Sequence, residues 1–208
     1  MRSEGRRAPD VDVRVLDPKV PAATVDGYLD TLAHVVPAIT DFFNPGWTTR
    51  IRLVIDPGYT DGPAAAGDGV ITVSAGYART HPRDLDVVTH EATHLVQAYS
   101  PGTYGDRWHW VEGVADYARY RFGRDNAACG WSIAHYERGS AHTDGYRATA
   151  RFLAWAVEAG GDGIVQDLDA ALRNGTYSDE FWAVRTGDDI AALWSRYVRA
   201  SVTGWRPV

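Results

Sequence analysis

The chain has 208 residues, of which 45% are hydrophobic and 23% are charged, as in an ordinary globular protein. The formal net charge of −6 argues against nucleic acid or an anionic membrane as a partner, because either would call for a basic surface. No apolar run reaches the length of a membrane span, and the single Cys129 excludes both an internal disulfide and a zinc site built from several cysteines.

The N-terminus differs from the rest of the chain. Residues 1–10 hold Arg2, Arg6 and Arg7 among mostly polar neighbours, and we expect them to be disordered. We expect residues 11–204 to form a single domain, since a chain of this length can bury one full core. The protein is expected to be a monomer. Residues 1–10 lack the apolar stretch of a secretory signal. The protein is therefore expected either to be cytoplasmic or to have lost a leader.

The first part of the chain is predicted to form mainly strands. Alternating apolar residues predict a strand over 11–16, and helical spacing predicts a helix over 24–43. Two further apolar runs predict strands over 50–56 and 69–75. Turn signals such as Asp61-Gly62-Pro63 predict a loop between these two strands.

The remainder of the chain is predicted to form mainly helices. Apolar residues at helical spacing run from about Pro82 to Tyr99, and again over 106–122. A loop over 123–143 precedes further predicted helices, at 144–159, 163–173, 178–186 and 188–201. Strands followed by helices favour the α+β class.

The most informative motif is His90-Glu91-Ala92-Thr93-His94, the pattern H-E-x-x-H. On a helix, two histidines four residues apart project from one face, so both imidazoles can reach one metal ion. The intervening Glu91 then lies beside the open position of that metal, where it can act as a base. The motif therefore predicts a Zn²⁺ site on the predicted helix that ends near Tyr99.

A catalytic zinc site needs a third protein ligand, and three carboxylates downstream could supply it: Asp106, Glu112 and Asp116. Glu112 and Asp116 are the better candidates because they share one face of a predicted helix. One of the two can bind the metal while the other accepts a hydrogen bond from a ligand histidine. Asp106 lies in the preceding turn and suits only another class of zinc enzyme.

The metzincin pattern, H-E-x-x-H-x-x-G-x-x-H, is absent from the chain. Its glycine and third histidine are replaced here by Gln97 and Ser100. Gln97 comes seven residues after His90, at almost the same angle around the helix. We therefore expect Gln97 to support a metal ligand or to contact the substrate.

Several motifs in order resemble the plant basic secretory proteins and their bacterial relatives, which are zinc peptidases of the gluzincin type. The resemblance rests on the motif His90 to Gln97 and on Glu112-Gly113-x-Ala115-Asp116-Tyr117-x-Arg119. It continues over 145–153 and 175–182, and again at Leu193-Trp194. It implies a zincin-like fold, with a small N-terminal sheet packed on the active-site helix and a mainly helical C-terminal half. It also implies a secreted location, although the chain is acidic.

The resemblance implies a role for each matching residue. His90, His94 and Glu112 would bind the zinc ion, and Glu91 would be the general base that later donates a proton. Asp116 would accept a hydrogen bond from a ligand histidine. Tyr146 is our candidate for the donor to the developing oxyanion, with His135 and His142 as alternatives in the adjoining loop.

The leading functional hypothesis is a zinc-dependent peptidase that hydrolyses a peptide or protein substrate with a metal-activated water. The alternatives are a non-catalytic protein that keeps the zinc scaffold for binding, and a zinc hydrolase of a non-peptide amide or ester. The predicted strand at 69–75 is a candidate sheet edge for an extended substrate. Trp108, Trp110 and Tyr117 could form a substrate wall, although packing in the core is the expectation for such residues.

Overall fold

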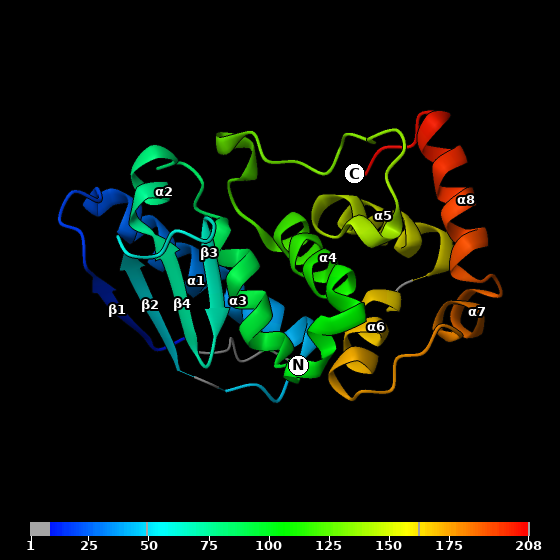
Figure 1. Cartoon of the computed structure of the whole chain (residues 1–208), viewed down its shortest axis with the longest axis horizontal. Helices are drawn as coiled ribbons and strands as arrows, with labels where there is room; N and C mark the ends of the chain where they lie inside the picture. The colour runs from blue at the N-terminus through cyan, green and yellow to red at the C-terminus, as the bar shows by residue number, and fades with distance from the viewer. Residues whose placement is uncertain (1–8, 49, 162, 208) are drawn as a thin grey trace, which may run out of the picture. The chain divides into compact units, whose positions relative to one another are not determined.

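The computed structural model describes residues 9–48, 50–161 and 163–207 (Figure 1). These residues form four strands, all in the N-terminal half, and eight α-helices, which confirms the predicted α+β class. The chain divides into two compact units, 1–96 with 121–131 and 97–120 with 132–208. A single domain over 11–204 stays a prediction. The segment predicted to be disordered, 1–10, lies outside the described residues except for its last two.

The first unit is built around one four-stranded sheet. Its strands are β1 (Val11–Val15), β2 (Ile51–Asp56), β4 (Val70–Ser74) and β3 (Ala64–Gly67), in that spatial order. The first three are parallel, and β3 runs antiparallel to β4. Side chains at alternate positions of β2 and β4 are fully buried, as expected for a sheet with a covered face: Ile51, Leu53, Ile55, Ile71 and Val73.

The edge of this sheet differs from the prediction. We expected the strand near 69–75 to be an edge, but β4 is paired on both sides, and the edge beside it is β3. The sequence predicted a loop here because Ala64 to Gly67 show no alternation of apolar and polar residues. Asp68 and Gly69 both have positive φ, at 49° and 76°, which a tight hairpin turn requires.

Three helices belong mainly to the first unit: α1 (Ala22–Phe43), α2 (Ala75–Thr80) and α3 (Val87–Gln97). Helix α1 passes behind the sheet in the view of Figure 1. Helix α2 was not predicted, although Ser74 accepts a hydrogen bond from the Tyr77 amide and so caps its start. Helix α3 begins five residues later than the predicted Pro82, after two turns.

The second unit is helical, as predicted. It contains most of α4 (Tyr104–Phe122), then α5 (Tyr146–Gly160), α6 (Ile164–Arg173), α7 (Phe181–Thr186) and α8 (Ile190–Val202). Short 3-10 turns at Pro101–Thr103 and His142–Asp144 lie in its connections, and a further one at Asn126–Cys129 belongs to the first unit. Among the described residues, no helix combines the length and the hydropathy that a membrane crossing needs.

Large aromatic side chains fill the core of the second unit. The ring centroids of Trp110 on α4 and Trp182 on α7 lie 5.1 Å apart. Those of Phe152 on α5 and Tyr197 on α8 lie 5.6 Å apart. The buried Arg151 on α5 donates hydrogen bonds to the Tyr197 hydroxyl at 2.9 Å and the Ser201 hydroxyl at 2.6 Å. These contacts join α5 to the C-terminal helix.

Candidate metal centre

Helix α3 carries the two histidines on its least buried side. Val88, Ala92 and Val96 are fully buried, so apolar packing fixes the rotation of the helix about its axis. His94 is only partly buried, and 9% of the His90 surface is exposed to solvent. The spacing of four residues places both rings on the same face, as the motif predicted.

Polar contacts hold both ends of α3. At its start, the buried Asp86 carboxylate accepts hydrogen bonds from the Thr89 hydroxyl at 2.8 Å and from the amides of Arg124 and Asp125 at 3.0 and 2.7 Å. At its end, the Asn44 side chain donates to the Val96 carbonyl at 2.9 Å. These bonds fix the helix along its axis and so position the two imidazoles.

Helix α4 presents Glu112 on a narrow accessible strip. Between residues 108 and 119, only Trp108 and Glu112 are not buried, and they lie one turn apart. The next residue, Gly113, faces α5 so closely that a Cβ atom there would lie 2.3 Å from the Thr149 side chain. The glycine therefore lets α4 pack tightly against α5 beside Glu112.

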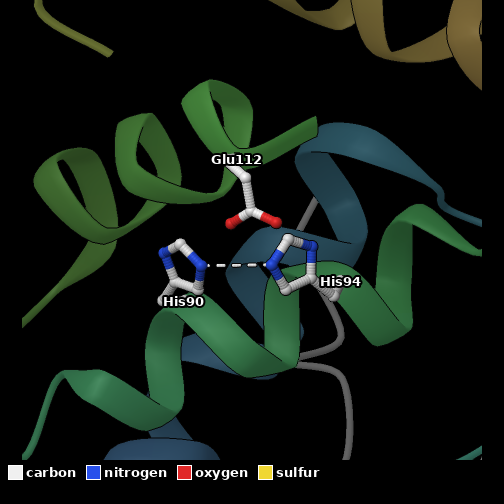
Figure 2. Close-up of side chains that lie close together, drawn as sticks. All are labelled: His90, His94 and Glu112. Atoms are coloured by element: carbon white, nitrogen blue, oxygen red, sulfur yellow. Dashed lines mark hydrogen bonds between the residues drawn. The ribbon is translucent and has the colours of Figure 1, made fainter. Parts of the chain in front are cut away.

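The structure brings His90, His94 and Glu112 together. Each offers one ligand atom, and these atoms all lie within 4.8 Å of one another. Figure 2 shows the Glu112 carboxylate pointing towards the two imidazole rings, whose Nε2 atoms are 3.1 Å apart. Two nitrogens bound to one tetrahedral zinc at about 2.0–2.1 Å would be about 3.3 Å apart. The donor set and its spacing therefore fit a zinc ion with an open fourth position.

The other carboxylates considered as third ligand lie elsewhere on α4. Asp106 is exposed near the start of the helix, and neither Asp106 nor Asp116 joins the group of candidate ligands found among the described residues. Asp116 is buried, with 5% of its surface exposed, one turn after Glu112. A buried carboxylate at this spacing can accept a hydrogen bond without binding the metal itself.

Gln97, the last residue of α3, is completely buried. Its side-chain amide donates a hydrogen bond of 3.3 Å to the backbone carbonyl of Val111, the residue before Glu112. That bond supports the backbone of α4 beside a candidate ligand. The burial of Gln97 favours this supporting contact over direct contact with a substrate.

Glu91 is buried, with 6% of its surface exposed. Tyr59, in the loop before β3, lies within electrostatic range of it. Burial chiefly raises the pKa of the Tyr59 hydroxyl, and the charges of Glu91 and Asp61 add to the rise. The hydroxyl donates a hydrogen bond of 3.2 Å to the Ala64 carbonyl on β3. No pattern in the sequence singled out Tyr59, because its position depends on the path of the loop.

The three candidate oxyanion donors have different surroundings. Tyr146 is 51% exposed and has a φ of 44°, an unusual conformation for a bulky residue. The His142 ring is stacked on that of Trp110, at 5.8 Å, and burial lowers its pKa, so it is neutral at pH 7. His135 lies exposed on the loop before it.

His109 lies beside His142, with ring centroids 5.8 Å apart. Burial lowers the pKa of His109 to about 4, and repulsion by His142 and Arg107 adds to the effect. Its imidazole is therefore neutral at physiological pH. His109 is not among the candidate metal ligands found in the described part of the chain.

Comparison with known proteins places the chain in a peptidase family. A family model described as "Peptidase of plants and bacteria", named BSP, matches residues 49–197, which include all the candidate site residues. No curated protein and no solved structure gives a significant match to the chain.

Proposed function

The chain belongs to the BSP family of peptidases of plants and bacteria, and from that premise we propose a zinc-dependent peptidase whose metal is held by His90, His94 and Glu112. The observation that carries this proposal is the group of three ligand atoms within 4.8 Å of one another. Two histidines and one glutamate leave a fourth position open, as catalytic zinc sites require. Family membership supports a peptide or protein as substrate.

Glu91 is the proposed general base. When bound, zinc lowers the pKa of a coordinated water to about 7 and polarises the scissile carbonyl. The Glu91 carboxylate accepts the proton of the attacking water and then delivers it to the leaving amine. Because Glu91 is 6% exposed, bulk water is largely kept from the group that carries the proton.

We assign supporting roles to Asp116 and Gln97. The buried Asp116 carboxylate accepts a hydrogen bond from the second ring nitrogen of a ligand histidine, which fixes its tautomer and orientation. Gln97 supports the α4 backbone through the Val111 carbonyl, next to Glu112. Neither residue contacts the substrate in this proposal.

Tyr146 is the proposed donor to the oxyanion that develops on the scissile carbonyl. Its exposure, at 51%, leaves its side chain accessible to a bound peptide. Unusual backbone conformations such as its positive φ cost of order 1–3 kcal/mol and tend to cluster at functional sites. His142 and His135 are the alternatives, and His142 packs against aromatic rings that restrict its movement.

Digestion of a peptide library by zinc-loaded protein tests the proposal. We expect cleavage that a chelator abolishes and that added zinc restores. Cleavage that survives complete removal of the metal would contradict the zinc dependence. The absence of any cleaved peptide would contradict the peptidase proposal, and a panel of amide and ester substrates would then separate a non-peptide hydrolase from a non-catalytic binding protein.

A further inference from the structure

We propose that Trp108 and Tyr146 form an aromatic platform that binds a large apolar or aromatic side chain of the substrate beside the scissile bond. This inference rests on the proposed peptidase function and names the substrate class of the same site. Three features of the second unit carry it: the accessible strip of α4, the close packing of Trp108 on Gly145, and the conformation of Tyr146.

The accessible strip of α4 contains one proposed metal ligand and one aromatic residue. Glu112 and Trp108 are four residues apart and so lie on the same side of the helix. Every other residue from 108 to 119 is buried, whereas 40% of the Trp108 surface is exposed. The expectation that Trp108 packs in the core is therefore wrong. The same expectation is confirmed for Trp110 and Tyr117, of whose surfaces only 1% and 2% are exposed. A peptide bound at Glu112 extends along this strip over the indole ring.

The indole of Trp108 is held in a defined position. A Cβ atom at Gly145 would lie 2.5 Å from the Trp108 ring, so only a glycine allows the ring to pack there. Gly145 also has a φ of 70°, which disfavours any other residue. One side of the indole thus packs on the backbone while part of the ring stays open to solvent. A fixed ring loses little conformational entropy when a ligand packs on it.

Tyr146 completes the platform. Its ring centroid lies 6.1 Å from that of Trp108, with an angle of 57° between the ring planes, which is within the range of interacting aromatic pairs. Tyr146 keeps a positive φ of 44° and remains 51% exposed, so its unusual conformation does not serve to bury the ring. Contact with a ligand gives such a conformation a function.

The cation that precedes Trp108 in the sequence does not favour an acidic ligand, because it is already paired. Arg107 precedes Trp108, but its guanidinium lies 5.0 Å from the Tyr177 ring centroid and 3.4 Å from the Asp179 carboxylate. This cation is therefore already engaged by a carboxylate and an aromatic ring. The two exposed rings offer apolar surface and ring edges, which an aromatic or large aliphatic side chain can cover.

The test compares two peptides that differ at one position. The library first locates the sites that wild type cleaves, and a peptide with Phe next to the scissile bond is paired with the same peptide carrying Ala. The variants are Trp108→Ala, Trp108→Phe, which keeps a ring, and Val184→Ala, a control that changes an exposed apolar residue on α7. Zinc content and thermal unfolding of each variant report on the metal site and the fold.

We expect wild type to prefer the Phe peptide, and Trp108→Ala to lower kcat/KM for it about tenfold while changing the Ala peptide by about twofold or less. Trp108→Phe should restore most of the preference, and Val184→Ala should retain it fully. Equal losses for both peptides, or an unchanged preference in Trp108→Ala, would overturn the platform while leaving the peptidase intact. Failure of wild type to cleave any peptide would instead overturn the proposed function, and the platform with it.

Discussion

A Cβ atom placed on Gly113 would lie 2.3 Å from the Cγ2 atom of Thr149 and 2.6 Å from its Cβ atom. Gly113 follows Glu112 on α4, and Thr149 is completely buried on α5. The Thr149 hydroxyl is itself fixed, because it donates a hydrogen bond of 2.7 Å to the His142 carbonyl. The position of Glu112 therefore depends on close packing between two helices.

Gly113→Ala should destabilise the protein, although alanine is favoured over glycine in a helix by about 1 kcal/mol. Overpacking typically costs about 1–3 kcal/mol. A Cβ contact of 2.3 Å places the cost near the upper end of that range, so we expect a net loss of up to about 2 kcal/mol in the free energy of unfolding. Thr149→Ala in the same chain should relieve the clash. Urea unfolding of both single variants and the double variant measures this. Strictly additive effects would show that the two residues do not compete for the same space.

Glu112→Gln should weaken zinc binding, because it removes the charged ligand and leaves two histidines. We expect the zinc content of the dialysed protein to fall from about one ion per chain to a small fraction of that. Asp106→Asn is the matched control, since Asp106 is an exposed carboxylate on the same helix. Loss of zinc in Asp106→Asn with retention in Glu112→Gln would reverse the assignment of the third ligand.

The buried His109 should make stability depend on pH. Its pKa is lowered to about 4 in the folded protein, against about 6.5 when unfolded. Below pH 6.5 His109 takes up a proton in the unfolded chain but not in the folded one. The free energy of unfolding therefore falls as the pH drops from 6.5 towards 4. The loss amounts to about 3 kcal/mol.

The measurement compares the free energy of unfolding at pH 7 and pH 4.5 in metal-free protein. His109→Gln should lose much less stability between these pH values than wild type does. His135→Gln, in the exposed loop, should behave as wild type. The same pH dependence in His109→Gln as in wild type would show that another group is responsible.

Tyr146→Phe removes the proposed oxyanion donor and keeps the ring of the platform. We expect kcat to fall about 100-fold, the usual size of the effect when one such donor is lost. Zinc content and the preference for the Phe peptide should not change. Full activity in Tyr146→Phe would move the donor role to His142 or His135, which the corresponding glutamine variants would then examine.

Periodicity predicted the fold class and most of the helices, because an apolar stripe on a long helix is a local property of the sequence. It failed where structure depends on pairing. The Ala-Ala-Ala-Gly segment of β3 is a strand through its bonds to β4, and the glycine and aspartate of the following turn were the available signal. Periodicity also placed the start of α3 too early, because apolar residues precede its first turn.

The candidate metal site could be predicted only in part. The two histidines share one helix, so their spacing in the sequence fixes their relation. The choice of Glu112 over Asp106 and Asp116 depends on how α4 is rotated and packed, which the sequence pattern left open. The proximity of Tyr59 to Glu91 and the exposure of Trp108 depend in the same way on tertiary packing.

Glu91→Gln tests the central claim most directly, because it separates the base from the metal. The variant keeps the shape of the side chain and leaves His90, His94 and Glu112 unchanged. We predict about one zinc ion per chain, as in wild type, together with a fall in kcat/KM for peptide cleavage of at least about 100-fold. Full peptidase activity in the zinc-loaded Glu91→Gln protein would contradict the account.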